Sequence, residues 1–176
     1  HGPMGEDGTV QGLLKLLGLP FVGPSVLGSA IGMDKDVMKR LLRDAGIPVA
    51  QFLTVRSFER GNLDFESVKK QLGLPLFIKP ANMGSSVGIS KVKNREDFVR
   101  GVDLAFQFDN KILIEEAVVG REVECSVLGN ESPRASVFGE VINNVDFYSY
   151  EAKYMDPKAA TTKIPAEISP DVLKKG

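Results

Sequence analysis

A lysine is followed by a loop of glycine and serine residues in the stretch FIKPANMGSSVGISKV, residues 77–92. Lys79 ends an apolar run, and Gly84 and Gly88 enclose two serines and a valine. Glycines let a ligand approach the backbone N–H groups, and serine hydroxyls add further donors. Many donors at short range beside a cation suit the oxygens of a polyphosphate. A flexible turn without a chemical role has the same composition, so the loop alone leaves both interpretations open.

The order of the elements around this loop excludes three common phosphate-binding motifs. A P-loop ends in GK followed by Ser or Thr and opens a helix, whereas VGISKV returns to a strand. A dinucleotide-binding fingerprint also needs its glycines at the start of a helix. Protein kinases place the glycine loop before the lysine and carry HRD and DFG motifs, which this sequence lacks. What remains is a glycine loop between two strands that covers nucleotide phosphates, with the lysine on the preceding strand.

Apolar residues at helical spacing predict four helices, and short apolar runs predict the strands between them. The expected helices span residues 9–18, 33–46, 62–73 and 94–109, with Asp64 and Asn94 as N-caps of the last two. The expected strands or extended segments span residues 19–23, 47–55, 74–80, 89–92, 111–129 (two strands joined at Gly120) and 134–142. Residues 146–166 show no clean period, which predicts an ordered loop. The predicted class is mixed α/β with much antiparallel sheet.

Side-chain periodicity also predicts which residues are buried. In the helix at 33–46 the apolar residues recur on one side and are expected to face inward. These residues are Val37, Met38, Leu41, Leu42 and Ala45. The single cysteine, Cys125, shares a strand face with Val123 and Val127, and we expect it to be a small buried hydrophobe. A nucleophilic thiol is the alternative, but the only histidine that could activate it is His1.

The composition is that of an ordinary globular protein, since 43% of the 176 residues are apolar and 26% are charged. A formal net charge of -1 gives no basic excess for binding a nucleic acid. No apolar run approaches the roughly 20 residues of a membrane span, and no signal peptide opens the chain, so we expect the cytoplasm. A single cysteine excludes an internal disulfide and fits a reducing compartment. With no initiator Met and a helix beginning at SPDVLKKG, the sequence is expected to be part of a longer protein.

Further motifs accompany the glycine loop in a fixed order. The sequence opens with HGPMGEDGTVQG, continues with MDK, IKPANMGSSVGISKV and ILIEEAVVGREVECSVLG, and then reaches FYSYEAKY. Together these motifs resemble the D-alanine–D-alanine ligases of the ATP-grasp superfamily, from residue 1 to about residue 165. The resemblance implies an α/β (α+β) ATP-grasp fold, with two α+β subdomains around a nucleotide cleft and the remnant of an N-terminal Rossmann-like domain. Three domains are implied. Residues 1–23 are the end of the N-terminal domain, residues 24–114 are the central subdomain with the loop, and residues 115–176 are the first part of the C-terminal subdomain.

The resemblance implies a nucleotide site with contributions from several motifs. Lys35 and Lys79 would contact the phosphates, and Phe77 would pack on the adenine. Glu115 would accept a hydrogen bond from the adenine amino group, and Glu122 would bind the ribose hydroxyls. The other implied nucleotide contacts are Ser85 and Ser86 in the loop, Glu116, Ala117 and Val118 beside the base, and Phe147, Tyr148 and Lys153 in a mobile loop over the site. A solvated surface position is the alternative for Lys35 and Glu122, and it is our interpretation of Glu124.

The resemblance also implies a substrate site. Ser85 would help to position the first D-alanine, Tyr154 would share a hydrogen-bond network with Ser85, and Lys153 would lie near the γ-phosphate. These three residues are the implied catalytic residues. His1 and Glu6 match family positions near the substrate pocket. Family members that make D-alanyl-D-lactate have a different loop here, so YEAKY favours synthesis of the dipeptide.

The implied activity is ATP-dependent ligation of two D-alanines through an acyl phosphate, for peptidoglycan precursors, by a homodimer. The implied metal is Mg²⁺, with an Asp, a Glu and an Asn ligand expected beyond Gly176, so this sequence alone is expected to be inactive. The partners would be ATP and D-alanine, with no nucleic acid and no membrane. Two alternatives stay open. One is another ATP-grasp carboxylate–amine ligase that uses a different acid, and the other is a nucleotide-binding truncated paralogue without activity.

Overall fold

The computed structural model describes residues 2–143 and 160–169. The chain divides into two compact units, residues 1–118 and residues 119–176. The helices are α1 (Thr9–Leu16), α2 (Val26–Met33), α3 (Lys35–Asp44), the 3-10 helix η1 (Ser57–Asn62), α4 (Phe65–Leu72) and α5 (Arg95–Ala105). The strands are β1 (Phe52–Arg56), β2 (Leu76–Pro80), β3 (Ser90–Val92), β4 (Lys111–Glu116), β5 (Glu122–Glu124), β6 (Val127–Leu128), β7 (Arg134–Ala135), β8 (Gly139–Asn143) and β9 (Ala160–Lys163). This mixture of helices and antiparallel strands confirms the predicted class.

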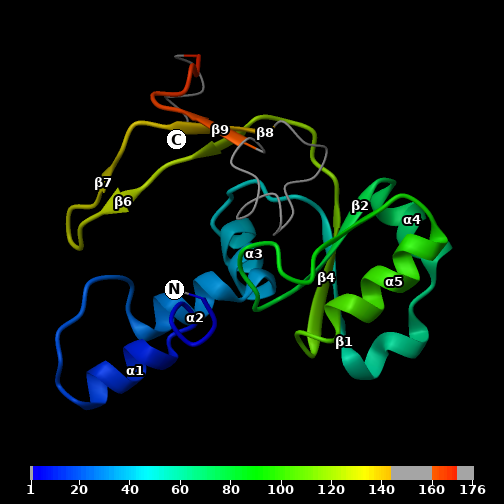
Figure 1. Ribbon diagram of the computed structural model, residues 1–176, viewed down its shortest axis with the longest axis horizontal. Helices are drawn as coiled ribbons and strands as arrows, with labels where there is room; N and C mark the ends of the chain where they lie inside the picture. Colours follow the sequence, from blue (N-terminus) through cyan, green and yellow to red (C-terminus); the bar gives the residue numbers. More distant parts are fainter. Residues whose placement is uncertain (1, 144–159, 170–176) are drawn as a thin grey trace. The chain divides into compact units, whose positions relative to one another are not determined.

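The first unit contains an antiparallel four-stranded sheet in the order β1-β4-β2-β3. Helices α4 and α5 lie on one side of this sheet and α3 lies on the other (Figure 1). Successive residues of a strand point to opposite faces, so Ile78 and Ile114 face α4 and α5 while Lys79 and Glu115 face α3. The apolar face carries the core, which is Val55, Phe65, Val68, Leu72, Leu76, Ile78, Val92, Phe98, Val102, Ala105, Ile112 and Ile114.

The helices that cover the core begin where their capping residues predict. The Asp64 carboxylate accepts a hydrogen bond from the Ser67 backbone N–H at 2.9 Å, and the Asn94 side chain accepts one from the Asp97 N–H at 2.9 Å. These bonds satisfy backbone donors that the first turn of a helix leaves without a partner. Both predicted N-caps are therefore confirmed. The side of α5 that faces the sheet is apolar, since Phe98, Val102 and Ala105 are buried.

One prediction near the start of the chain is wrong, and one helix there was not predicted. Residues 19–23 form no strand, and Val22 is 99% exposed. Within the ranges that the structure covers, no strand pairs with this segment, and a strand needs a neighbour for its backbone hydrogen bonds. The sequence analysis also missed α2, because its two glycines and a serine lower helix propensity. Ser25 compensates by capping the helix through the Gly28 N–H.

The prediction that the apolar residues of α3 face inward is only partly confirmed, since Met38 and Leu42 are half-buried while Val37, Leu41 and Ala45 are exposed. Val37 is 36% exposed and Leu41 is 47% exposed, whereas Asp36 is buried. The sheet face that α3 covers carries charged side chains, so the helix places its own charged residues against that face. Lys111 Nζ on β4 lies 2.6 Å from the Asp34 carboxylate at the N-cap of α3. The Thr54 hydroxyl on β1 donates to Asp36 at 2.7 Å.

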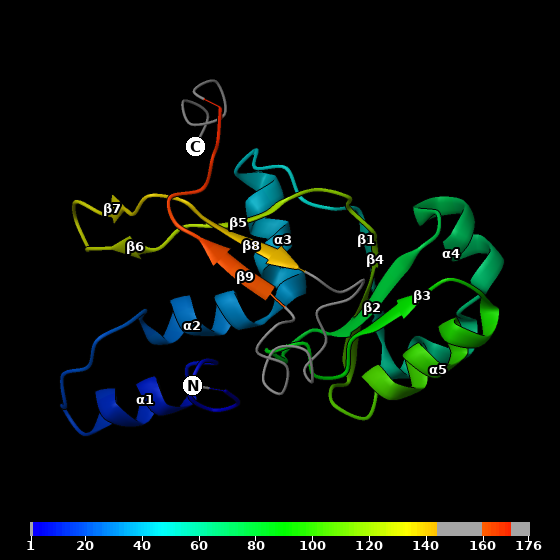
Figure 2. The same ribbon diagram turned by 45° about the horizontal axis from the view of Figure 1, so that its top comes forward.

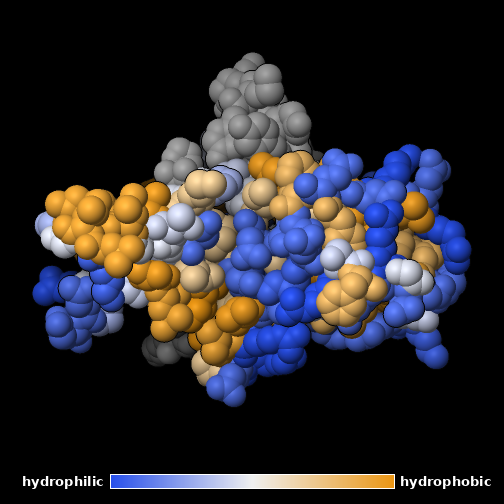
Figure 3. All heavy atoms as spheres, turned by 90° about the horizontal axis from the view of Figure 1, so that it is seen from below, coloured by the Kyte–Doolittle hydropathy of each residue, from blue (hydrophilic) through white to orange (hydrophobic). Residues whose placement is uncertain are grey.

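Helix α1 has no buried residue, although its apolar residues share one side. Leu16 is 87% exposed and Leu17 is 62% exposed. Figure 3 shows hydrophobic surface gathered at the left of the view, the side on which α1 and α2 lie in Figure 1. The described core of the first unit therefore depends on α4 and α5 and not on α1.

The second unit contains a sheet in the order β5-β8-β9 and a hairpin of β6 and β7 (Figure 2). Cys125, between β5 and β6, is exposed, and so are Val123 and Val127. The predicted burial of this cysteine is therefore wrong. Among the residues placed in this unit, no helix packs on the strands, so alternation along them does not lead to burial.

Candidate functional site

The site begins at the centre of the first unit's sheet, on the face toward α3. Phe77 lies directly opposite Glu115 in the pairing of β2 with β4, and Lys79 lies opposite Leu113. Lys79 and Glu115 are therefore diagonal neighbours, a separation that a lysine side chain spans easily. Lys79 Nζ makes an ion pair with Glu115 Oε2. The structure thus brings together two residues that the sequence analysis assigned to phosphate and to adenine.

A second lysine binds the same carboxylate. Lys39 Nζ, from α3, makes an ion pair with Glu115 Oε1, so each oxygen of Glu115 has its own ammonium partner. Burial acts to raise the pKa of Glu115, but the charge of Lys79 and the hydrogen bonds from Lys39 and Lys79 outweigh it and hold this pKa below the ordinary value. Glu115 is therefore an ionised, nearly buried carboxylate at neutral pH.

This arrangement predicts an acid-sensitive contribution to stability. Because the folded-state pKa of Glu115 is below the ordinary value of 4.5, ionised Glu115 stabilises the fold above about pH 4.5, and this stabilisation is lost as the pH falls through the folded-state pKa. We expect the free energy of unfolding of the full-length protein to fall between about pH 6 and about pH 3, and to fall less steeply in Glu115→Gln. Chemical denaturation at each pH measures the free energy of unfolding. Exposed Glu131→Gln is the control, and parallel curves for wild type and Glu115→Gln would contradict the prediction.

The start of the glycine loop is held by Lys35, the first residue of α3. Its backbone N–H donates to the Ala81 carbonyl at 3.1 Å, and its ammonium group donates to the same carbonyl at 3.3 Å and to the Met83 carbonyl. Burial and the like charge of Lys79 lower the pKa of Lys35 from its ordinary value. Asn82, which lies between Ala81 and Met83, is held as well, because its backbone N–H and its side-chain amide both donate to the Asp109 carboxylate, at 2.8 and 2.9 Å. Lys35 is therefore not a solvated surface lysine.

The loop itself has an unusual backbone. Ser85 and Ser86 have φ angles of 53° and 61°, in the left-handed region, which costs about 1–2 kcal/mol for a residue with a Cβ atom. Strained conformations of this kind cluster at functional sites. Two turns close the loop, with the Val87 N–H donating to the Gly84 carbonyl and the Ile89 N–H donating to the Ser86 carbonyl.

The two glycines of the loop have different surroundings. A Cβ atom at Gly88 would lie 2.7 Å from the Phe108 ring and 2.8 Å from Pro80, and its φ is 70°. Gly88 is therefore required by packing within the protein, whereas the sequence analysis expected it to admit a ligand. Among the described residues, a Cβ atom at Gly84 would meet only Glu6 Oε2, at the ordinary contact distance of 3.8 Å, so these residues leave Gly84 more space than Gly88. This contact also places Glu6, a predicted substrate residue, next to the loop.

The remaining predicted residues fall into three groups. The Glu116 carboxylate accepts a hydrogen bond from the Gln51 N–H at 2.7 Å, and Val118, the last residue of the first unit, is exposed and follows Ala117. Glu122 begins β5 of the second unit, opposite Val141. His1, Phe147, Tyr148, Lys153 and Tyr154 lie outside the described residues.

The sequence analysis missed Lys39 and the other charged and polar residues that join α3 to the sheet, Asp34, Asp36, Thr54 and Lys111. One signal was available, since Lys39 follows Lys35 by four residues and so lies on the same helix face. That spacing shows that Lys39 and Lys35 share a helix face, but it does not show that Lys39 meets Glu115.

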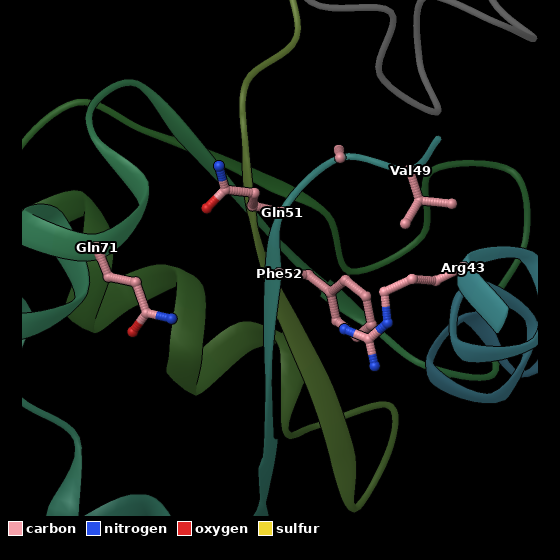
Figure 4. Close-up of a pocket in the computed structure, with 6 residues that line it drawn as sticks. Arg43, Val49, Gln51, Phe52 and Gln71 are labelled. Atoms are coloured by element: carbon pink, nitrogen blue, oxygen red, sulfur yellow. The ribbon is translucent and has the colours of Figure 1, made fainter. Parts of the chain in front are cut away.

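A pocket of about 240 Å³ lies beside β1 and is lined by Arg43, Val49, Ala50, Gln51, Phe52 and Gln71 (Figure 4). None of these residues belongs to the predicted site. Its polar side chains, from Arg43, Gln51 and Gln71, are exposed. We therefore assign the candidate site to the lysine–glutamate cluster and the loop.

In residues 2–143 and 160–169, no group of three or more His, Cys, Asp or Glu side chains is placed to hold a metal ion. No helix in these ranges combines the length and the apolar character that crossing a membrane requires.

Solved structures define the class to which this fold and site belong. The chain aligns over 99% of its length with 50% of the VanG D-Ala:D-Ser ligase from Enterococcus faecalis, with a TM-score of 0.87 and 37% identity. It aligns over 99% of its length with 54% of the D-alanine–D-alanine ligase from Bacillus anthracis, with a TM-score of 0.77 and 30% identity. The class is therefore that of the D-alanine ligases with the ATP-grasp fold.

Sequence comparisons give the family. The family described as "D-ala D-ala ligase C-terminus" matches residues 41–175. The D-alanine–D-alanine ligase of Oceanobacillus iheyensis is 58% identical over 173 residues, which are 98% of this chain and 47% of the relative. D-alanine–D-alanine ligase A of Escherichia coli K12 is 53% identical over 175 residues, 99% of this chain and 48% of the relative. The chain belongs to the D-alanine–D-alanine ligase family, as its motifs predict, and it spans about half the length of these curated relatives.

Proposed function

We propose that the full-length protein carrying this chain is an ATP-dependent D-alanine–D-alanine ligase. The observation that carries the proposal is the cluster of Lys35, Lys79 and Glu115 at the start of the glycine loop. Two cations beside a loop with backbone donors suit the phosphates of ATP. The names of the curated relatives, at 58% and 53% identity, support the choice of D-alanine as the acid and as the amine.

The proposed reaction has two steps. A carboxylate oxygen of one D-alanine attacks the γ-phosphorus of ATP, which gives an acyl phosphate and ADP. The neutral amine of the second D-alanine then attacks the carbonyl carbon, phosphate leaves with the C–O bonding electrons, and the amine loses a proton. Phosphate is a far better leaving group than a carboxylate oxygen, so ATP drives the ligation. The protein contributes positioning and charge neutralisation.

The residue roles in this proposal follow the family pattern. Lys35, Lys79 and Lys153 neutralise phosphate charge, and Ser85 and Ser86 donate from the loop. Phe77, Phe147 and Tyr148, together with Glu115 to Val118 and Glu122, bind the adenosine part. Ser85 and Tyr154, with His1 and Glu6, position D-alanine. We further propose that Mg²⁺ takes part, that the enzyme is a cytoplasmic homodimer that supplies peptidoglycan precursors, and that its domains are residues 1–23, 24–114 and 115–176.

The deciding experiment measures ADP release by the full-length protein with ATP and one amino or hydroxy acid at a time. We expect release with D-alanine, but not with L-alanine or D-lactate alone. Pairing D-alanine with D-serine tests the second-substrate preference that the Enterococcus faecalis neighbour is named for. ATP turnover that does not respond to D-alanine would reject the ligase, and dependence on another acid would favour a different carboxylate–amine ligase. Nucleotide binding without turnover would favour the inactive paralogue.

The proposed role of Tyr154 makes a separate prediction about the product. We expect Tyr154→Phe to raise the share of D-alanyl-D-lactate when D-alanine and D-lactate compete, because the hydroxyl is lost from the network with Ser85. Mass spectrometry of the products measures the ratio. Tyr150→Phe, in the same motif, is the control, and an unchanged ratio in Tyr154→Phe would remove this role.

A further inference from the structure

The Glu115 carboxylate has two ammonium partners from two different elements. Lys79 reaches it from the neighbouring strand β2, and Lys39 reaches it from α3. The side chains of Glu115, Lys39 and Lys79 are 6%, 13% and 20% exposed. One negative charge between two nearly buried positive charges leaves a net positive charge, which favours an anion nearby.

Lys39 is not the only residue that attaches α3 to the sheet. Lys111 on β4 already pairs with Asp34 at 2.6 Å, and Thr54 on β1 donates to Asp36 at 2.7 Å. Lys39 also lies 5.5 Å from the centre of the Phe52 ring, so its position is fixed by more than Glu115. Its contact with Glu115 is therefore one of several that dock the helix, and it leaves room for a second purpose.

That purpose follows from the role of Lys79. If Lys79 binds a phosphate, its ammonium group must turn at least partly away from Glu115. A nearly buried carboxylate that loses its only cation is strongly destabilised. Lys39 supplies a cation that stays when Lys79 leaves, because it comes from another element and binds the other oxygen.

We propose that Lys39 is a positioning residue of the nucleotide site, which holds the Glu115 carboxylate while Lys79 turns from it to the phosphates. Without Lys39, Lys79 is the one cation among residues 2–143 and 160–169 that pairs with Glu115, and binding a phosphate means breaking that pair. The inference rests on the proposed function, since it takes the phosphate role of Lys79 from there.

The test uses Lys39→Met in the full-length protein, with Lys111→Met as a matched control. Both variants remove a lysine that joins α3 and β4 through a carboxylate, and the two lysine side chains are 13% and 12% exposed. The affinities to measure, by calorimetry, are those for the nonhydrolysable ATP analogue adenylyl imidodiphosphate and for inorganic tripolyphosphate, which lacks the adenosine. The free energy of unfolding of each variant is measured in parallel.

We expect Lys39→Met to weaken binding of both ligands by about tenfold, the equivalent of one hydrogen bond to a charged group. Lys111→Met should change both affinities less than about twofold, even where it costs as much stability. Lys39→Arg should restore most of the affinity, because it keeps the charge. Lys39→Met/Glu115→Gln should regain tripolyphosphate affinity, because the amide no longer competes for Lys79.

Equal losses in Lys39→Met and Lys111→Met would overturn the inference, and so would a failure of both Lys39→Arg and the double variant to recover affinity. A wild type that binds the ATP analogue but makes no dipeptide would reject the ligase function alone, and the affinities would still decide the role of Lys39. A wild type that binds neither ligand would overturn both.

Discussion

Replacing Lys79 by methionine in the full-length protein is expected to weaken ATP binding by about 10- to 100-fold, the value of a hydrogen bond between charged groups. Methionine keeps the length and apolar part of the side chain but removes the ammonium group. The fold should survive, because Lys39 continues to pair with Glu115. The affinity for adenylyl imidodiphosphate, measured by calorimetry, gives the effect directly.

Lys15→Ala is the control for this variant. Lys15 is exposed on α1, and its replacement by alanine removes the same charge from the protein as Lys79→Met does. An electrostatic effect of net charge alone would weaken ATP binding equally in both variants. Equal affinities of the two variants would therefore count against a phosphate role for Lys79.

Replacing Gly88 by alanine is expected to destabilise the protein by about 2 to 5 kcal/mol. The new Cβ would stand 2.7 Å from the Phe108 ring and 2.8 Å from Pro80, and a φ of 70° disfavours any residue with a Cβ atom. Pro80 cannot move freely, because it is fully buried at the end of β2, although the Phe108 ring is 39% exposed. The free energy of unfolding measures the effect, and a change below about 0.5 kcal/mol would contradict it.

Gly84→Ala is the matched variant in the same loop. Its Cβ would meet Glu6 Oε2 at 3.8 Å and no other atom of the described part of the chain within 4 Å, so the free energy of unfolding should change little. If ATP phosphates approach the backbone at this position, the added methyl group should weaken ATP binding. Unchanged ATP affinity in Gly84→Ala would show that the ligand does not approach the loop at Gly84.

Much of the fold could be predicted from the sequence because its signals are local. The helices α4 and α5 combine an apolar stripe with a capping residue a few positions away, and both features stay within one helix. The order of strand, loop and strand from β2 to β3 could also be predicted, because these elements are consecutive in the chain. The motifs along the sequence were enough to predict the family, which the comparisons confirm.

The errors arose where a local pattern needs a distant partner. Alternation around Cys125 predicts a shared face, but no described helix covers that face. Likewise, the apolar residues of α3 share a side of the helix, while the sheet face that α3 meets is charged and selects Asp36 and Lys39 instead. Periodicity shows which side chains lie together, and the opposing surface decides which of them become buried.

The loop, its lysine, the order of the motifs and the family follow from the amino-acid sequence alone. The three-dimensional fold was needed to show that Glu115 binds both Lys39 and Lys79, that Lys35 holds the carbonyls of the loop, and that Gly88 is packed against Phe108 and Pro80. The physical reason is separation along the chain. Residues 39, 79 and 115 meet only because β2 and β4 pair and α3 packs across them, and no local preference of any of the three residues specifies that meeting.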